Sequence, residues 1–200
     1  MKRFLNVGGN NKKILVPRHF SNYEHILLDI DPKGGPDIVC DARELTSLGA
    51  KTFDAIYCSH NLEHYYRHEV PKVLAGFAHI LKDEGFVQIR VPDIAEVMQT
   101  TINRGLDIDD VLYTSRSGPI RVSDVIYGYS VEIERSGQDF FAHKIGFTKK
   151  SLLKVLFKSG FSRVYTSLGN FEINAFAFKD VPDQFTRELL NLPEDENLDD

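Results

Sequence analysis

Four short segments near the start of the chain constrain its fold more than any other feature. In order they are FLNVGGNN, LLDIDP, DIVCDARELT and FDAIYCSHNLEH. The first three are apolar runs that each end at a glycine-rich turn or an aspartate. Continuous apolar runs are typical of buried parallel strands, and ligand-binding α/β sheets place such turns and carboxylates at the carboxyl ends of their strands. The segments therefore predict an α/β sheet with a ligand site at that edge.

The first ninety residues alternate between strand and helix patterns. A helix is predicted over residues 70–81, where apolar side chains recur at helical spacing. A turn over residues 83–85 should follow it. Such alternation implies right-handed crossovers and a doubly wound sheet. Residues 11–23 are the exception, because Pro17 interrupts any helix there, and a short or irregular connection is expected. Strands are predicted over residues 3–7, 24–30, 36–40, 53–58 and 86–91.

The carboxyl-terminal part returns to a regular pattern after a long irregular segment. Thr148 should cap a helix that stops at Gly160. Residues 162–168 and 171–179 then predict a hairpin through Gly169-Asn170. A short helix over 183–190 and an acidic tail should end the chain. A helix should begin at residues 94–102, but the segment 93–145 as a whole interrupts the sheet, which favours a lid or a substrate-selecting wall. If it were instead a structural layer, it could form a homodimer contact.

Composition and charge narrow the classes of function. The 200 residues suit one domain, and 42% hydrophobic residues suffice for a sizeable core. A net charge of −5 without a basic block argues against a nucleic-acid partner. No apolar run is long enough for a membrane span, and the first strand begins too early to leave room for a signal peptide. Cys40 and Cys58 lie in predicted buried strands as free thiols, so a cytoplasmic setting is expected.

The polar residues at the predicted strand ends suggest the ligand. Gly8 and Gly9 follow the first strand, and Asp29 ends the second about 20 residues later, the interval of a ribose-binding carboxylate. Asp41 ends the third strand. Two carboxylates at consecutive strand ends suit a ligand with both a ribose diol and an adenine amino group. Each aspartate could instead be a helix cap.

The whole pattern resembles the class I S-adenosylmethionine-dependent methyltransferase family, closest to its small bacterial, type 11-like members. That subgroup carries Leu-Glu-His after the fourth strand, Val-Pro-Asp after the fifth and His-x-x-Gly-Phe-Thr before the final helix. Here these motifs occupy residues 62–64, 91–93 and 143–148. The resemblance implies a doubly wound, mostly parallel, seven-stranded Rossmann-like sheet with a closing antiparallel hairpin. It implies one domain over residues 1–180 with an insertion at about 93–145, and a short helix and acidic tail over 181–200.

The resemblance also implies a set of cofactor-binding residues. The glycine loop would pass close to the methionine part of S-adenosylmethionine, and Asn10 replaces the family's second glycine while tolerating positive φ. Asp29 would bind the ribose, Ile30 would flank the adenine, and the fourth-strand end would lie beneath the reactive methyl group. The implied residues are Asn6, Gly8, Gly9, Asn10, Asp29, Ile30, Asp41, Ala42, Ser59 and His60.

Three histidines are candidates for a general base, which a hydroxyl acceptor would need. In order of preference they are His60, His64 and His143. The spacing of His60, His64 and His68, with Cys58 or Glu63 nearby, also invites a metal interpretation. No HExxH pattern is present and Cys58 lies inside a predicted strand, so no metal site is expected. His68 should be exposed to solvent.

The function predicted from these observations is methyl transfer from S-adenosylmethionine, with S-adenosylhomocysteine as product, to a small molecule or sugar. One alternative is a non-catalytic, nucleoside-binding protein that keeps the fold. Another is a nicotinamide-dependent oxidoreductase, which would need a complete G-x-G-x-x-G, whereas Gly8 is followed by Gly-Asn-Asn-Lys-Lys.

Overall fold

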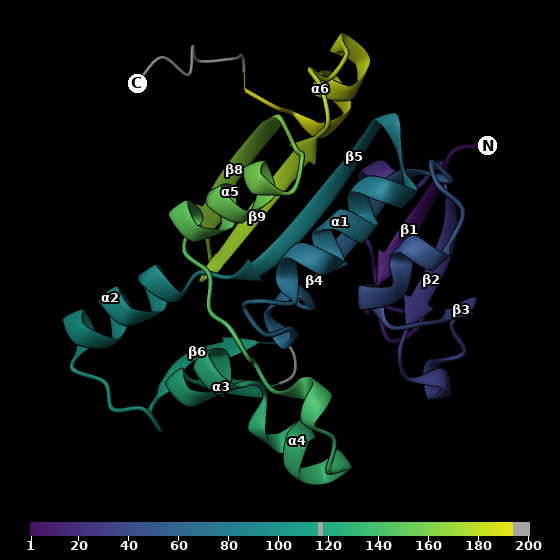
Figure 1. Ribbon diagram of the computed structural model, residues 1–200. Helices are drawn as coiled ribbons and strands as arrows, with labels where there is room; N and C mark the ends of the chain where they lie inside the picture. The colour runs from purple at the N-terminus through teal and green to yellow at the C-terminus, as the bar shows by residue number, and fades with distance from the viewer. Residues whose placement is uncertain (116–117, 194–200) are drawn as a thin grey trace.

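A seven-stranded sheet forms the centre of the computed structural model, which describes residues 1–115 and 118–193 (Figure 1). The strand order is β3-β2-β1-β4-β5-β9-β8. The strands from β3 to β5 in this order are parallel to one another. Strand β9 is antiparallel to both β5 and β8. The predicted fold class is therefore confirmed. The strands are β1 Arg3–Val7, β2 Glu24–Asp29, β3 Ile38–Val39, β4 Phe53–Ser59, β5 Leu81–Pro92, β8 Arg163–Gly169 and β9 Glu172–Phe178.

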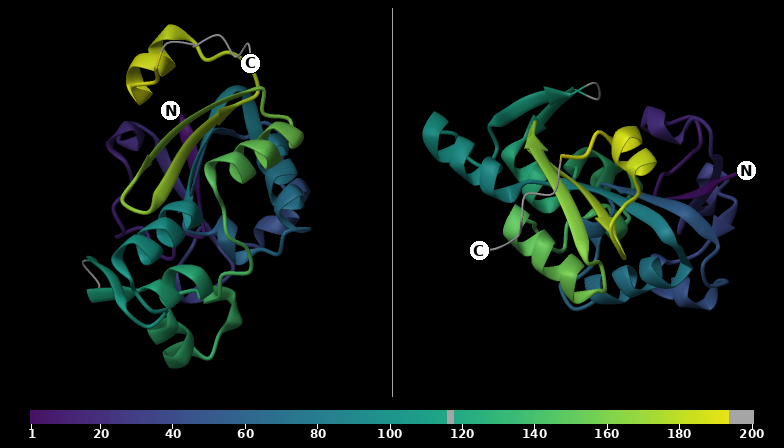
Figure 2. Two further views of the ribbon diagram at one scale, coloured as in Figure 1. Left: turned by 90° about the vertical axis from the view of Figure 1, so that its left-hand side faces the viewer. Right: turned by 90° about the horizontal axis from the view of Figure 1, so that it is seen from above.

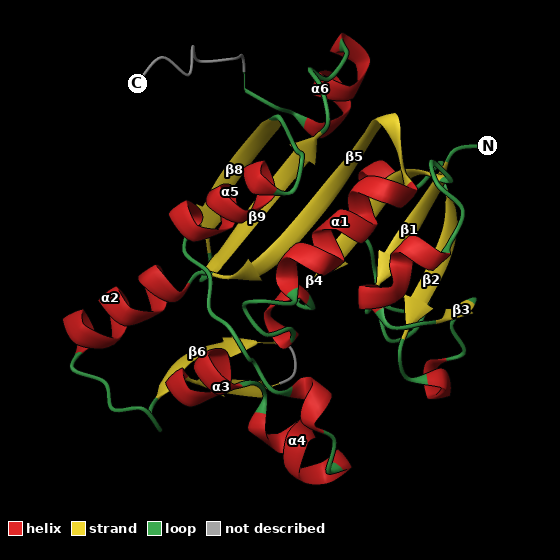
Figure 3. Cartoon of the chain, in the orientation of Figure 1, coloured by secondary structure: helices red, strands yellow, loops and turns green. Residues whose placement is uncertain are grey.

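Helices connect these strands, and several of them are single 3₁₀ turns (Figure 3). The α-helices are α1 Val70–Ile80, α2 Ile94–Arg104, α3 Val122–Tyr127, α4 Ser130–Ser136, α5 Lys149–Lys158 and α6 Gln184–Leu190. The 3₁₀ helices are η1 Arg18–Phe20, η2 Pro32–Gly34, η3 Ala42–Ser47, η4 Leu62–His64 and η5 Asp139–Phe141.

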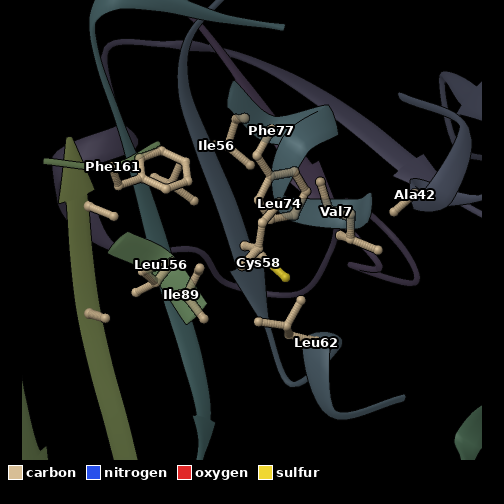
Figure 4. Close-up of a cluster of buried hydrophobic side chains, with 14 of the residues drawn as sticks. Val7, Ala42, Ile56, Cys58, Leu62, Leu74, Phe77, Ile89, Leu156 and Phe161 are labelled. Atoms are coloured by element: carbon tan, nitrogen blue, oxygen red, sulfur yellow. The ribbon is translucent and has the colours of Figure 1, made fainter. Parts of the chain in front are cut away.

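One face of the sheet is covered by α1 and α5, and the main core lies beneath them (Figures 2 and 4). Leu74 and Phe77 of α1 pack on Ile56 and Cys58 of β4, while Leu156 of α5 packs near β5. All of these side chains are fully buried. Burial of each leucine, isoleucine or phenylalanine side chain stabilises the fold by about 1.5–3 kcal/mol. This packing fixes the carboxyl ends of the strands, where the candidate site lies.

The opposite face has a separate, aromatic core. Phe4, Phe20, Phe86 and Phe178 pack there with Leu190 of α6. Phe20 belongs to η1, which is the three-residue helix of the first crossover. The irregular connection expected over residues 11–23 is thus present, and an aromatic side chain fills the space that a longer helix would occupy.

Two turns differ from the prediction. Residues 83–85 do not form a separate turn: β5 begins at Leu81, and its pairing with β4 shifts between Phe53 and Ala55 to absorb them. In the closing hairpin Gly169 still pairs with Glu172, so the two turn residues are Asn170 and Phe171, both at positive φ. Two positive φ values match the twist of a two-residue hairpin turn.

The segment over residues 93–145 lies beyond the carboxyl ends of β1, β2 and β5 (Figure 1). It contains α2, α3, α4 and a two-stranded antiparallel sheet of β6 Val111–Ser115 and β7 Gly118–Arg121. Val97, Leu112, Val122 and Val125 form its own small core. Neither α4 nor η5 contains a buried residue. The predicted acidic tail, residues 194–200, lies outside the described residues.

Within the described residues, no helix is both long and apolar enough to cross a membrane.

Candidate active site

A cavity of about 530 Å³ opens at the carboxyl ends of β1, β2 and β4. The loops after these strands form its floor, and side chains of α4, η5 and the residues around them form the opposite wall. The floor residues include Gly8, Asn10, Asp29, Ile30, Asp41, His60, Asn61 and His64, and the opposite wall includes Glu132, Arg135, Phe140 and Phe141.

The glycine loop after β1 is shaped by close contacts. Gly8 has φ of 69° and faces the cavity, and a Cβ there would lie 2.1 Å from Nδ2 of Asn61. Asn10 has φ of 59°, so it adopts the left-handed conformation that asparagine tolerates better than most residues. Gly8 and Asn10 therefore present backbone to a ligand at close range.

Asn6 and Gly9 support this loop and do not line the cavity. Asn6 is buried, and its amide nitrogen lies 3.1 Å from Nε2 of His25. A Cβ on Gly9 would lie 2.3 Å from Nδ2 of Asn6, so a larger residue at Gly9 would push the loop away from the sheet.

Asp29 faces the cavity from the end of β2. One carboxylate oxygen accepts the backbone N–H of Asn10, and the other accepts that of Asp31, both over 2.9 Å. Each oxygen keeps a second lone pair for a ligand hydroxyl. Ile30 follows, is 49% exposed and lines the same cavity.

Asp41 both caps η3 and pairs with an arginine. Its carboxylate accepts the backbone N–H of Arg43 over 2.8 Å and the guanidinium over 2.6 Å. Burial raises the pKa of Asp41, but the hydrogen bonds from Arg43 lower it by more, so the carboxylate stays ionised. The guanidinium also pairs with Glu69. Ala42 is buried and does not line the cavity.

His60 lies between two carboxylates. Nε2 is 2.8 Å from Glu172, and Nδ1 is 3.4 Å from Glu63. Burial lowers the pKa of His60, but the interactions with Glu172 and Glu63 raise it by a larger amount, so the net shift is upward. Glu172 also pairs with Arg90 over 2.6 Å. His60 is therefore an imidazolium held in a network of alternating charges. Its backbone φ is 48°, which turns the chain sharply after β4.

A second cavity of about 400 Å³ adjoins the first. The two share His60, His64, Glu132 and Phe141, so they meet at the end of β4. Its walls are mixed aromatic and polar, with Tyr113 stacked on Phe171 at 5.3 Å between ring centroids. Its other lining residues include Tyr129, Asp124, His143 and Glu172.

His64 and His143 come from distant parts of the chain and face each other, with ring centroids 5.0 Å apart. Nδ1 of His143 donates to the carbonyl of Val125 over 2.8 Å. Burial lowers the pKa of His143, which favours the neutral ring. Ser59 lines neither cavity, and His68 is exposed.

Several residues at the site were not predicted. Asn61 supports Gly8, Arg43 holds Asp41, and Glu172 binds His60. The sequence placed Glu63 in the Leu-Glu-His motif and near the histidine trio, but did not indicate that it is buried and touches His60. The available signal for Glu172 was that it is the one charged residue of β9. For Arg43 the sequence gives no comparable signal.

Comparisons with known proteins agree with this geometry. Residues 18–89 match the family model described as "Methyltransferase domain". Comparison with curated proteins finds no match. Among solved structures, an S-adenosylmethionine-dependent methyltransferase from Archaeoglobus fulgidus is 16% identical with a TM-score of 0.55, covering 88% of this chain and 85% of that one. A protein from Pyrococcus horikoshii gives 16% identity and 0.55, covering 89% and 82%.

A third similar structure is the complex of DhpI with S-adenosylhomocysteine, at 15% identity and a TM-score of 0.51, covering 92% of this chain and 78% of that one. At these identities the likeness concerns the fold, and the domain match covers residues 18–89. The chain therefore has the fold of the class I S-adenosylmethionine-dependent methyltransferases, and its residues 18–89 match a methyltransferase domain model.

Proposed function

We propose that this protein transfers the methyl group of S-adenosylmethionine to a small-molecule acceptor and releases S-adenosylhomocysteine. The observation that carries the proposal is the meeting of the two cavities at His60 and His64. Methyl transfer is an in-line displacement, so donor and acceptor must approach one point from opposite sides. Holding them there is worth about 7–11 kcal/mol of the barrier. One cavity for each reactant fits this requirement.

The first cavity is assigned to the cofactor. Gly8 and Asn10 would receive its methionine part, Asp29 its ribose hydroxyls, and Ile30 and Asp41 its adenine. Support comes from the position of these residues after β1, β2 and β3, and from S-adenosylhomocysteine bound to the similar protein DhpI. The ionised state of Asp41 suits an acceptor for an amino group.

The second cavity is assigned to the acceptor. A volume of about 400 Å³ is of the size that binds small molecules. Aromatic walls with Asp124, Glu172 and three histidines favour a polar molecule with a flat or apolar side, such as a sugar. The free thiols Cys40 and Cys58 support the cytoplasm as the compartment.

The histidines receive different roles in this proposal. His60 holds a proton between Glu63 and Glu172, so it suits positioning and charge better than proton removal. His64 and His143 line the acceptor cavity, and they are the groups beside which an acceptor hydroxyl would lose its proton.

Calorimetric titration with S-adenosylmethionine and S-adenosylhomocysteine, with NAD as the control, tests the proposal. Binding of both adenosyl ligands but not of NAD supports it, and binding of NAD alone would assign an oxidoreductase.

A second candidate function is that of a non-catalytic nucleoside-binding protein. It is favoured by Asn10 in the glycine loop and by the ion pair of Asp41 with Arg43, which engages the carboxylate already. Cofactor binding without turnover on any member of a small-molecule panel would favour that candidate.

A further inference from the structure

A buried carboxylate and two imidazoles converge beside the second cavity. One carboxylate oxygen of Glu63 and one ring nitrogen each of His64 and His143 lie within 4.8 Å of one another. Glu63 is 1% exposed, and among the described residues no group donates a hydrogen bond to either of its carboxylate oxygens. An ionised carboxylate buried in this way requires a cationic partner.

His60 meets that requirement only in part. Its Nδ1 is 3.4 Å from Glu63, without the geometry of a hydrogen bond, whereas its Nε2 is 2.8 Å from Glu172. The imidazole of His60 thus lies between two carboxylates and is hydrogen-bonded to Glu172, which Arg90 also contacts. The lone pairs of Glu63 remain available for another cation.

The ring of His143 is oriented as a metal ligand is, and that of His64 needs a rotation to become one. Nδ1 of His143 donates to the carbonyl of Val125, so Nε2 carries a lone pair. The ring nitrogens of His64 lie 3.1 Å from the carbonyl oxygen of Ala142 and 3.2 Å from that of His60. A neutral ring donates to only one of these carbonyl oxygens, and a rotation of the ring would turn the other nitrogen from the second carbonyl oxygen toward a metal ion. A backbone carbonyl that holds the second ring N–H is a common feature of metal-binding histidines.

The backbone brings the distant histidine to this place. The carbonyl of Glu63 accepts the N–H of Lys144 over 2.8 Å and that of Ile145 over 3.3 Å. These bonds tie the segment after His143 to η4, which carries Glu63 and His64. The cluster is therefore a built feature of the fold, since main-chain hydrogen bonds hold its two halves together.

We propose that Glu63, His64 and His143 bind a divalent transition-metal ion, with Zn²⁺ as the best match. Two nitrogens and one carboxylate oxygen are ligands of open zinc sites, whereas Mg²⁺ and Ca²⁺ prefer oxygen ligands. Neighbouring donors around a tetrahedral zinc ion are about 3.4 Å apart, so small side-chain rotations bring these three onto one ion. The remaining position faces the second cavity, which both histidines line.

A bound ion would also indicate that the acceptor atom is an oxygen. An oxygen atom of the acceptor can take the open position, where the metal would lower the pKa of a hydroxyl group so that its proton passes to solvent water and no histidine base is needed. This consequence rests on the proposed function, but the binding of the metal does not. These three ligands are not the trio His60, His64 and His68 that the sequence suggested. His143 is distant in sequence and reaches the site only through the tertiary fold.

The test is a metal titration of the chelator-treated full chain. Co²⁺ should bind with one equivalent and give a visible absorption band, and Zn²⁺ should displace it. Glu63→Gln and His143→Ala should each weaken Co²⁺ binding by about a hundredfold or more. His68→Ala removes an exposed histidine outside the cluster and should bind as the wild type does. Circular dichroism checks that each variant is folded.

Absence of stoichiometric Co²⁺ and Zn²⁺ binding by the wild type would overturn the proposal. So would undiminished binding by folded Glu63→Gln and His143→Ala variants, because the ion would then lie elsewhere. S-adenosylhomocysteine affinity, measured on the same samples, separates this proposal from the proposed function. Metal binding without cofactor binding would contradict the proposed function and support the metal site. Cofactor binding without metal binding would contradict only the metal site.

Discussion

The backbone N–H of Asn10 donates a hydrogen bond to Oδ2 of Asp29 over 2.9 Å. This bond joins the turn after β1 to the end of β2, so the carboxylate positions the glycine loop before any ligand arrives. The other oxygen of Asp29 accepts the N–H of Asp31. A single side chain thereby holds two turns at the edge of the candidate cofactor cavity.

Replacing Asp29 should weaken cofactor binding. Asp29→Ala removes the acceptor for the ribose hydroxyls, at about 1–3 kcal/mol, so the affinity for S-adenosylhomocysteine should fall roughly ten- to a hundredfold. Asp29→Asn keeps one acceptor oxygen and should fall between the alanine variant and the wild type. Calorimetry measures both, with thermal unfolding as the check on folding. An unchanged affinity in a folded alanine variant would exclude this role.

Because Asn10 is in the left-handed conformation, alanine and glycine at this position should affect the loop differently. Asn10→Ala should destabilise the loop by about 1 kcal/mol, because alanine pays more than asparagine at positive φ. Asn10→Gly should keep the turn and bind S-adenosylhomocysteine at least as tightly as the wild type. Urea unfolding and calorimetry provide the two measurements. Weaker binding by the glycine variant would mean that the Asn10 side chain itself contacts the cofactor.

The sheet could be predicted because each of its strands carries its own signal. Apolar runs, closing aspartates and glycine turns are local patterns, and they located β1, β2, β4 and α1 to within a residue or so. The sheet β6–β7 and the helices α3 and α4 were not predicted. The small core of this segment joins Val97 of α2 to Leu112 of β6 and to Val122 and Val125 of α3, so no single window shows a period.

The candidate site was predictable only where it follows strand ends. Asp29 and Asp41 could be located because their strands end at the same edge of the sheet. The meeting of Glu63 with His143 could not, since two backbone hydrogen bonds between distant segments create it. The pairing of Asp41 with Arg43 is likewise a matter of rotamer and not of spacing.

Asp41 should make the protein prefer adenine. An inosine analogue of S-adenosylhomocysteine presents a carbonyl oxygen where adenine has an amino group, so two acceptors would face each other. The analogue should bind about ten- to a hundredfold more weakly than S-adenosylhomocysteine. Competition calorimetry measures the ratio. Equal binding would leave Asp41 with only its other two contacts, the cap of η3 and the ion pair with Arg43.

Asp54 should make stability depend on pH. Its carboxylate accepts the backbone N–H of Arg3 and the ammonium of Lys82, each over 2.8 Å. Burial raises the pKa of Asp54, but these hydrogen bonds and the charge of Lys82 lower it by more. A lowered pKa in the folded state contributes stability above the unfolded pKa of about 3.9, and this is lost as pH falls through the folded value.

Asp54→Asn should therefore lower the free energy of unfolding by about 1–2 kcal/mol at pH 7. The difference from the wild type should shrink as the pH falls below about 4. Urea unfolding over this range measures it, and Asp83→Asn at an exposed ion pair is the control that should change little. A difference that stays constant with pH would mean that the charge of Asp54 does not contribute.

Residues 128–142 should close over the cofactor. Their helices α4 and η5 contain no buried residue, yet Glu132, Arg135 and Phe141 line the first cavity. The neighbouring Val97 in α2 belongs to a packed core. Amide hydrogen exchange should therefore be faster in 128–142 than in α2 without ligand, because few contacts hold this segment closed. S-adenosylhomocysteine should slow exchange in 128–142 more than in α2, since ligand contacts would add to those few. Protection of 128–142 equal to that of α2 in the free protein would instead identify the whole segment from 93 to 145 as a fixed structural layer.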